Sequence, residues 1–438
     1  MIHTHGWISA PAGPIRGDIT VPGDKSISHR AIMLAALADG TSRISGFLEG
    51  EDTRATAAAF GALGVKIEAP EPSRRIVHGL GMHGLSAPRA PIDCGNAGTG
   101  MRLLTGLLAG QSFDSTLTGD ASLSRRPMRR VIEPLTRMGA SIAAEPDDLP
   151  PLRIRGGCAL NGIDYAPPVA SAQVKSAILL AGLCAKGETT VRETHPTRDY
   201  TERMLAAFGW PIAFSPGVAT LTGGHRLRAT DVVVPADFSS AAFFIVAATL
   251  VPGSELRLRS IGLNPRRTGL LAVLRAMGAD IREEHEREEG GESVADLVVR
   301  SAPLRGIDVP MEHVPDMIDE FPILFIAAAA ARGTTTIRGA AELRVKESDR
   351  IATMANGLRA LGIAANETPD GAVIEGGSLG AGAVDSVGDH RIAMSFAVAG
   401  LIARGVVKIS DCANVATSFP GFAPLANSTG FALREAAC

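Results

Sequence analysis

The chain has 438 residues, of which 45% are hydrophobic, 20% charged and 4% aromatic, and its formal net charge is −3. This length predicts about two or three domains with ordinary hydrophobic cores. The slightly negative charge and the few aromatic side chains argue against a nucleic-acid partner, which needs a basic surface or a stacking platform.

The five cysteines are scattered without a C-x-x-C pair, and the ten histidines include no H-E-x-x-H motif. Because neither a disulfide framework nor a zinc site is indicated, we expect no metal and no cofactor. The longest apolar runs are far shorter than a membrane span, and the N-terminal residues lack the charged and apolar regions of a signal peptide. We therefore expect a cytoplasmic protein with no membrane partner.

The first candidate site is VPGDKSISHR, residues 21–30, between an extended stretch and a predicted helix. Lys25, Ser26 and Arg30, with the backbone amides at the start of the helix, are suited to hold an anion. The segment is no nucleotide-binding P-loop, because Asp24 separates the lysine from the preceding glycine. The alternative is that these polar residues only cap the helix.

An internal repeat organises the whole chain. Small apolar residues form segments such as AIMLAALADGTSRIS, which end in a glycine turn and continue into an extended stretch. The pattern recurs about every 70 residues, with turn glycines at Gly40, Gly110, Gly187, Gly253, Gly333 and Gly405. An interleaved series of amphipathic segments has a similar period and also closes on glycines, at Gly64, Gly139, Gly209, Gly278, Gly362 and Gly430.

Each repeat therefore predicts helix, strand, helix and further strands, an α/β (α+β) pattern of sheets covered by helices. Six such repeats divide into two similar domains of three. We expect repeats 1–3 to occupy residues 24–237, and repeats 4–6 to occupy residues 1–23 plus 238–438. The early extended stretch GPIRGDITVPGDK would give a strand to the later domain, so that the chain crosses twice between the domains.

Polar clusters recur at the strand-to-helix junctions of the first three repeats. They are DCGNAGTGMR (93–102), SLSRRPMRR (122–130), SAQVKSA (171–177) and the segment around Arg198. The glycines of the first cluster allow close approach of backbone to a ligand. Together the clusters predict a ring of cationic and hydroxyl groups at one end of a domain, whereas each arginine alone is typical of a solvated surface.

The later repeats place mixed charge at the same kind of junction. VPDMIDEFPILF (314–325), ELRVKESDR (342–350) and GDHRIAMSF (388–396) put charged side chains just before apolar stretches. The helix dipole favours the carboxylates at this end but not the lysine and arginine side chains. Because such charges are costly unless they pair or bind a ligand, the pattern predicts an anionic ligand between the cations.

In this order along the chain, DKSISHR, GNAGTG, SRRPM, SAQ, LRVKESDR and DHR resemble the motifs of the 5-enolpyruvylshikimate-3-phosphate synthase family, from about residue 14 to about residue 425. The resemblance implies two similar domains, each of three βαβαββ units, joined by a double-crossover hinge with the active site in the cleft between them. It implies transfer of the enolpyruvyl group of phosphoenolpyruvate to the 5-hydroxyl of shikimate 3-phosphate, with release of phosphate. This step of aromatic amino acid biosynthesis would be carried out by a monomer without a metal.

The resemblance also implies roles for residues of this chain. Asp319 would take the proton of the 5-hydroxyl, Glu347 would protonate the enol methylene, and Lys25 would assist. The implied shikimate 3-phosphate contacts are Lys25, Ser26, Arg30, Ser171, Ala172, Gln173, Arg198, Asp319 and Lys346. The implied phosphoenolpyruvate contacts are Lys25, Asn96, Gly98, Arg126, Gln173, Arg350 and Arg391.

Several positions depart from the family pattern. Ala172 replaces a serine of many members, and Thr417 stands where many carry a lysine. Thr197 stands where some members use a tyrosine, with Arg198 next to it as compensation. This mixture resembles the branch that tends to tolerate glyphosate, but Gly98 lacks the methyl group of the alanine in strongly tolerant members. The two signals disagree, so glyphosate sensitivity is left open.

Two other functions are weighed against this one. UDP-N-acetylglucosamine enolpyruvyl transferases share the fold and the donor but use a cysteine acid in a mobile loop, where this chain has SLSRRPM with Arg126. A non-catalytic anion-binding scaffold would have no reason to keep Asp319 and Glu347 among the cations.

Overall fold

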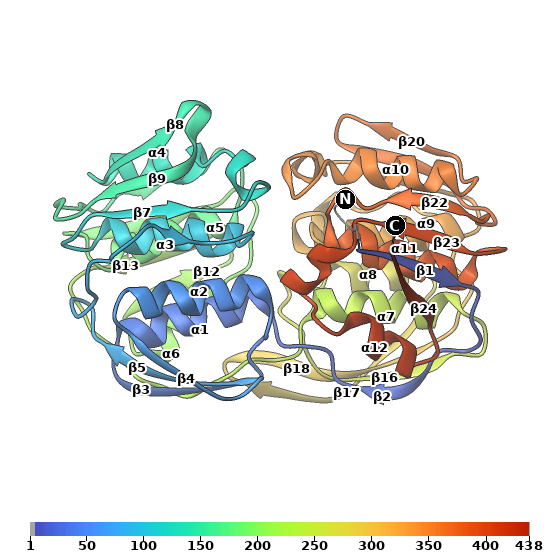
Figure 1. Cartoon of the computed structure of the whole chain (residues 1–438), viewed down its shortest axis with the longest axis horizontal. Helices are drawn as coiled ribbons and strands as arrows, with labels where there is room; N and C mark the ends of the chain where they lie inside the picture. Colours follow the sequence, from blue (N-terminus) through green and yellow to red (C-terminus); the bar gives the residue numbers. More distant parts are fainter. Residues whose placement is uncertain (1–4, 438) are drawn as a thin grey trace. The chain divides into compact units, whose positions relative to one another are not determined.

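The six apolar segments of the repeat form helices that run into β-strands in the computed structural model, which describes residues 5–437 (Figure 1). The chain forms two compact units. The first runs from Gly23 to Val234, and the second joins the segment up to Pro22 to the chain from Pro235 onward. Each has its own hydrophobic core and three sheets, so the predicted α/β class with six repeats is confirmed.

The first unit contains repeats 1 to 3. Repeat 1 comprises α1 (Lys25–Leu37), β3 (Ala38–Ser45), α2 (Glu51–Ala62), β4 (Lys66–Glu71) and β5 (Arg74–Leu80). Repeat 2 comprises β6 (Ile92–Asp93), α3 (Gly98–Ala109), β7 (Ser115–Thr118), α4 (Arg129–Arg137), β8 (Ser141–Glu145) and β9 (Leu149–Arg155). Repeat 3 comprises β10 (Asp164–Tyr165), α5 (Ala172–Gly182), β11 (Glu188–Arg192), α6 (Tyr200–Ala207), β12 (Ile212–Ser215) and β13 (Val218–Thr222).

The three sheets of this unit share one topology. In the orders β6-β7-β9-β8 and β10-β11-β13-β12, the first pair is parallel and the other pairs are antiparallel. In the sheet of repeat 1 the parallel partners of β3 are β14 (Leu227–Arg228) and β15 (Val232–Val233), from the far end of the unit. The last residues of the unit thus complete its first sheet.

The second unit contains repeats 4 to 6 and the N-terminal strands. Repeat 4 comprises β2 (Arg16–Ile19), α7 (Phe238–Leu250), β16 (Glu255–Gly262), α8 (Gly269–Met277), β17 (Asp280–Glu289) and β18 (Glu292–Arg300). Repeat 5 comprises α9 (Phe321–Ala330), β19 (Thr334–Ile337), α10 (Arg350–Ala360), β20 (Ala365–Thr368) and β21 (Gly371–Glu375). Repeat 6 comprises β22 (Gly382–Asp385), α11 (His390–Ile402), β23 (Val407–Ser410), α12 (Phe422–Ser428), β24 (Ala432–Ala437) and β1 (His5–Ala10).

The N-terminal segment supplies two strands to this unit. β2 pairs in parallel with β16, which confirms the expectation that the early extended stretch joins the later half of the chain. β1 pairs antiparallel with both β23 and β24, so it occupies the interior of the last sheet. The two pairings of β1 join segments from opposite ends of the sequence.

One helix of each repeat is buried on nearly all sides, as expected for a helix enclosed by other elements. In α7 every residue except Leu250 is buried, and α9 is buried from Phe321 to Ala329. These two helices pack against each other and against α11. In the first unit, α3 approaches α5 so closely that a Cβ on Gly106 would lie 2.1 Å from the carbonyl oxygen of Ala177. We call α1, α3, α5, α7, α9 and α11 the inner helices, and the even-numbered helices the outer helices.

Four of the inner helices begin at a polar residue that caps them. Asp24, Ser171, Asp237 and Asp389 each accept a backbone N–H as the N-cap of the helix that follows, which satisfies donors that the helix itself cannot. Because the sides of these helices are largely buried, the chemistry of the fold is concentrated at their N-terminal ends. Within residues 5–437, no helix combines the length and the apolar character needed to cross a membrane.

Two glycine-to-alanine substitutions should change stability in opposite directions. In α10, a Cβ on buried Gly357 would lie 2.2 Å from Cζ of the buried ring of Phe396, so Gly357→Ala should destabilise the protein by about 1–3 kcal/mol. In α2, exposed Gly61 has no atom within 4 Å of the added Cβ, so Gly61→Ala should stabilise it by roughly 0.5–1 kcal/mol. Urea unfolding measures both changes, and a lower midpoint for Gly61→Ala would contradict this account.

Candidate active site

The predicted site residues of the first unit share one kind of position, within the first turn of a helix or in the loop before it. At the inner helices these are Lys25, Ser26, Asn96, Gly98, Ser171, Ala172 and Gln173. Before the outer helices these are Arg126 and Arg198. Arg30 is the exception and lies one turn further along α1.

Arg30 is held rigidly inside the first unit. Its side chain is 4% exposed, and it donates to the hydroxyls of Thr201 (2.7 Å) and Ser176 (2.8 Å) and to the carbonyl of Ser26 (2.9 Å). Burial, followed by the positive charge of Arg198, lowers the pKa of Arg30 to about 10. Two guanidinium groups that repel each other at a helix start form a site that an anion stabilises.

Lys175 has a different role from the other cations of this unit. Its Nζ lies 2.8 Å from both Glu193 and Glu202 and 3.3 Å from the carbonyl of Thr197, and all three charged groups are buried. Burial alone would lower the pKa of Lys175, but the two carboxylates raise it. The lysine therefore anchors the segment that precedes Arg198, and its charge is used within the fold.

Gln173 and Arg126 connect the start of α5 and the loop before α4 to residues around the start of α3. Arg102 donates to Oε1 of Gln173 (2.7 Å), whose Nε2 donates to Thr99 (2.8 Å). Arg126 donates to Oδ1 of Asn96 (3.0 Å). Cations are locally unfavourable at a helix N-terminus, so these contacts indicate a place prepared for an anion.

Gly98 leaves room for two of these guanidinium groups. A Cβ at this position would lie 3.0 Å from Nη1 of Arg126 and 3.4 Å from Nη1 of Arg102. Any side chain here would therefore have to displace at least one arginine by a few tenths of an ångström.

Lys25 is paired with Asp52 of α2 at 2.9 Å. The aspartate is 5% exposed, and the lysine side chain is 18% exposed. The lysine can therefore be reached from solvent while the carboxylate beneath it fixes its position.

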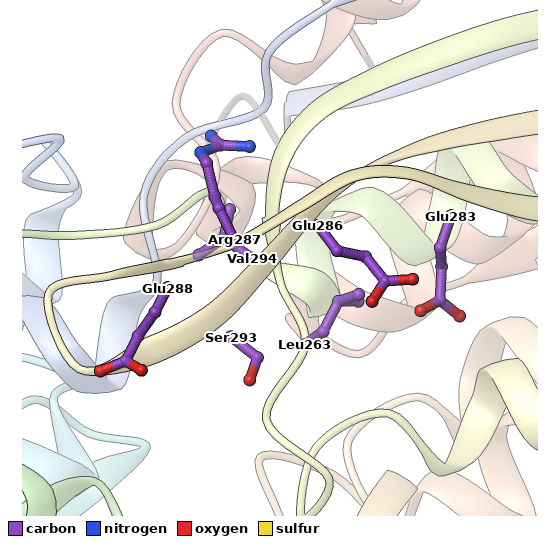
Figure 2. A pocket seen from close by; sticks show the side chains of 7 residues that line it. All are labelled: Leu263, Glu283, Glu286, Arg287, Glu288, Ser293 and Val294. Atoms are coloured by element: carbon purple, nitrogen blue, oxygen red, sulfur yellow. The ribbon is translucent and has the colours of Figure 1, made fainter.

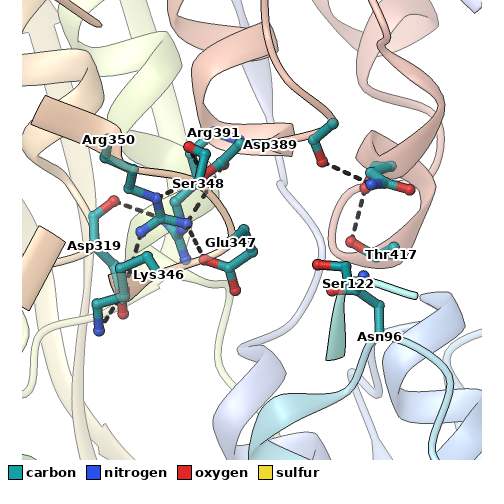
Figure 3. Close-up of polar contacts among 12 residues, drawn as sticks. Asn96, Ser122, Asp319, Lys346, Glu347, Ser348, Arg350, Asp389, Arg391 and Thr417 are labelled. Carbon is teal, nitrogen blue, oxygen red and sulfur yellow. Dashed lines mark hydrogen bonds and ion pairs between the residues drawn. The ribbon is translucent and has the colours of Figure 1, made fainter. Parts of the chain in front are cut away.

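In the second unit, a single buried arginine contacts three carboxylates (Figure 3). Arg350 is 1% exposed, and its guanidinium lies 2.8 Å from Asp389, 2.6 Å from Glu347 and 3.5 Å from Asp319. Burial lowers its pKa, but Asp389, then Glu347 and Asp319, outweigh that effect and raise it. The two carboxylates predicted to transfer protons are thus joined through one cation.

The carboxylates of this cluster differ in exposure. The side chains of Asp319 and Glu347 are 15% and 21% exposed, whereas those of Asp389 and Glu320 are fully buried. Only the first two can therefore contact a substrate directly. Burial raises the pKa of Glu320, and the charges of Arg267 and Arg391 oppose that effect.

The remaining predicted residues surround Asp319. Lys346 lies 3.9 Å from its Oδ1 and 3.1 Å from Glu342, and Arg391 donates to its backbone carbonyl at 3.1 Å. Thr417, before α12, donates to the carbonyl of Asn414 at 2.7 Å, so its hydroxyl hydrogen is used within its own turn. This position supplies no positive charge.

Sequence reasoning missed two partners of these side chains, Asp52 and Arg267. Arg267 precedes α8 and donates to Oδ2 of Asp319 at 2.9 Å. It stands at the same junction of its repeat as Arg126 and Arg198 do in theirs, and this shared position was the available signal. The contacts themselves join residues far apart in the sequence.

A pocket lies elsewhere in the second unit, between β17, β18 and the end of β16 (Figure 2). Its lining includes Glu283, Glu286 and Glu288, with Arg287 as the only cation. Carboxylates repel anions, so this pocket is unsuited to a phosphate or carboxylate ligand. Among the residues described, no group of three or more His, Cys, Asp or Glu side chains is arranged to hold a metal ion.

Comparisons with known proteins agree on one family. The family model described as EPSP synthase (3-phosphoshikimate 1-carboxyvinyltransferase) matches residues 10–425. A curated 3-phosphoshikimate 1-carboxyvinyltransferase from Xanthomonas campestris pv. campestris (strain B100) is 68% identical over 430 residues, which cover 98% of this chain and 98% of that relative. Another from Xanthomonas axonopodis pv. citri (strain 306) is 68% identical over 433 residues, or 99% of this chain and 98% of that relative.

Solved structures extend this similarity to the fold. An EPSP synthase from Acinetobacter baumannii matches with a TM-score of 0.89 and 51% identity over 99% of this chain and 100% of that chain. The enolpyruvyl transferase NikO from Streptomyces tendae matches with a TM-score of 0.80 over the full length of both chains, at 18% identity. At that identity the likeness shows a shared fold alone.

Proposed function

The chain belongs to the EPSP synthase family, and we propose that it transfers the enolpyruvyl group of phosphoenolpyruvate to the 5-hydroxyl of shikimate 3-phosphate, releasing phosphate. Identity of 68% over nearly the whole chain to 3-phosphoshikimate 1-carboxyvinyltransferases supports this reaction. The observation that carries the assignment of the site is the pairing of Asp319 and Glu347 with the same buried Arg350. Two partly exposed carboxylates among cations suit a reaction that adds and removes protons on anionic substrates.

We assign the phosphate of shikimate 3-phosphate to the first unit, and the contacts of the whole substrate to groups of the first unit together with Asp319 and Lys346 of the second. Arg30 and Arg198 would bind the phosphate, because they form a repelling pair that an anion relieves. The other groups proposed to contact this substrate are Lys25, Ser26, Ser171, Ala172, Gln173, Asp319 and Lys346. Ala172 contributes no hydroxyl, so the backbone and Ser171 carry the contact at this turn.

Phosphoenolpyruvate carries a phosphate and a carboxylate, and we assign it to the arginines of both units. Arg126, Arg350 and Arg391 would supply most of the positive charge, with Lys25, Asn96, Gly98 and Gln173 as the remaining contacts. Guanidinium groups bind phosphate and carboxylate in a bidentate manner, so no metal is required for binding. In this proposal the two units act on the same substrates within one chain, as a cytoplasmic monomer without a nucleic-acid partner.

The first chemical step is an addition. Asp319 takes the proton of the 5-hydroxyl while the oxygen forms a bond to C2 of phosphoenolpyruvate, and Glu347 donates a proton to C3, which becomes a methyl group. In the second step the roles reverse: the Glu347 carboxylate takes a proton from this methyl group, the C2–C3 double bond re-forms, and the bond between C2 and the phosphate oxygen breaks with its electron pair going to the phosphate. The proton held by Asp319 passes to the departing phosphate, and the enol ether is left on the product. Lys25 assists at the hydroxyl or at the bridging oxygen.

Electrostatic stabilisation of the departing phosphate should contribute more to the rate of the reaction than the proton transfers do. Each positioned proton transfer contributes about 100- to 10,000-fold. The departing phosphate gains a full negative charge, and preorganised guanidinium and ammonium groups stabilise it without reorganisation of water. A fixed set of buried arginines is the arrangement that this effect requires.

The UDP-sugar transferases are not favoured as an alternative. They use a cysteine as acid, and Arg126 lies in the corresponding segment of this chain. Burial raises the pKa of Cys94 to about 12 and that of Cys184 to about 11, and Cys412 is also buried. Cys94 and Cys412 are therefore poorly placed to contact a substrate, and the raised pKa of partly buried Cys184 disfavours its thiolate.

Replacing either carboxylate should slow the reaction without removing the fold. Asp319→Asn and Glu347→Gln should each lower kcat by about 100- to 10,000-fold, because each removes one proton transfer. Phosphate release at saturating substrates measures kcat, and Glu312→Gln, at an exposed position, is the control that should keep wild-type activity. Wild-type kcat in Asp319→Asn would remove that residue from the role of base.

Gly98→Ala should weaken inhibition by glyphosate more than binding of phosphoenolpyruvate. The added methyl group displaces Arg126 or Arg102 and narrows the space beside them. The inhibition constant of glyphosate and the KM of phosphoenolpyruvate measure the two effects, with Gly61→Ala as a control for a methyl group added to an exposed helix. Equal weakening of both would contradict the prediction.

A further inference from the structure

Arg267 connects repeat 4 to the carboxylates of repeat 5. It is 5% exposed and lies in the loop between β16 and α8. Its Nη1 lies 2.9 Å from Oδ2 of Asp319 and 3.8 Å from Glu320, and its Nη2 contacts the hydroxyl of Ser239 and lies 3.7 Å from Asp237. A buried guanidinium with three carboxylates around it makes a fixed part of the site.

Arg267 is the nearest of the cations whose side chains face the carboxylate of Asp319. Arg350 and Lys346 approach the other oxygen, Oδ1, at 3.5 Å and 3.9 Å. Both have closer carboxylate partners, since Arg350 lies 2.6 Å from Glu347 and Lys346 lies 3.1 Å from Glu342. The two oxygens of Asp319 thus face different cations, with Arg350 and Lys346 near Oδ1 and Arg267 near Oδ2.

The charges behind Asp319 also involve Arg267. Glu320 is fully buried beside it, and its charged partners are Arg267 at 3.8 Å and Arg391 at 3.7 Å. Asp237 caps α7 and faces the same guanidinium. Without Arg267, Asp319 would lose the cation that lies 2.9 Å from its Oδ2 while Glu320 and Asp237 remained nearby.

We propose that Arg267 is a positioning residue for Asp319. It fixes Oδ2, leaves Oδ1 directed toward Lys346 and Arg350, and keeps the carboxylate ionised so that it can accept a proton. This inference rests on the proposed function, in which Asp319 takes the proton of the substrate hydroxyl. It adds a residue of repeat 4 to a site assigned so far to the other five repeats.

The acidic limb of the pH profile of kcat/KM for shikimate 3-phosphate tests this role. In Arg267→Gln the carboxylate of Asp319 loses its nearest cation and holds its proton to higher pH, so the limb should move up by about one pH unit. Activity should fall most at acidic pH and recover toward alkaline pH. A merely structural role would lower activity at every pH and leave the limb in place, and that result would overturn the proposal.

Two further variants separate the effect of the positive charge of Arg267 on Asp319 from an effect on folding. Arg267→Lys keeps a cation near Oδ2 and should return the limb to its wild-type position. Arg266→Gln, which removes a partly exposed arginine 3.3 Å from Asp316, should leave the limb unchanged. A shift as large in Arg266→Gln as in Arg267→Gln would overturn the proposal, because removal of either arginine would then act through net charge alone.

A further pair of variants covers the case in which Arg267→Gln does not fold because buried Glu320 has lost one of its two cationic partners. Arg267→Gln combined with Glu320→Gln removes both charges, and its limb should lie above that of Glu320→Gln alone. Coincident limbs would overturn the proposal. A wild-type protein without turnover would instead contradict the proposed function, so the two failures are distinguishable.

Discussion

The site of the second unit depends on the ion pairs that the buried guanidinium of Arg350 forms with three carboxylates. Its charge is balanced by Asp389, Glu347 and Asp319, which come from three separate junctions of the chain. Breaking a buried ion pair by removing one partner typically costs about 3–5 kcal/mol, because a charge is left without compensation. The cluster therefore forms as a whole. Asp319 and Glu347 keep their place beside one cation while their exposed edges remain available to a substrate.

The repeat explains why charges gather at these points. The inner helices are largely buried, so a charged side chain within one of them needs partners, as Arg30 and Lys175 have. The strand-to-helix junction recurs in each repeat and is the position where charged side chains are more easily accommodated. The side chain at that junction differs between repeats. Arg198 precedes α6 beside another guanidinium, whereas Arg267 precedes α8 among carboxylates. A single backbone pattern has thus yielded both anion-binding positions and a position that supports a carboxylate.

Much of this could be predicted from the sequence, and the remainder depends on contacts between distant segments. The α/β repeats and the helix starts follow from local periodicity and glycine turns, and β2 was expected to join the later half. The central position of β1 could not be predicted, because its partners β23 and β24 lie at the other end of the chain. The pairings of Lys25 with Asp52 and of Arg267 with Asp319 were missed for the same reason.

The most direct test is to measure phosphate released from phosphoenolpyruvate with either shikimate 3-phosphate or UDP-N-acetylglucosamine as the acceptor. We predict release only with shikimate 3-phosphate, because 3-phosphoshikimate 1-carboxyvinyltransferases are 68% identical to this chain and no cysteine lies in the segment around Arg126. Release only with the UDP-sugar would contradict the assigned acceptor while leaving the fold intact. No release with either acceptor, from folded protein, would contradict the enzymatic function itself.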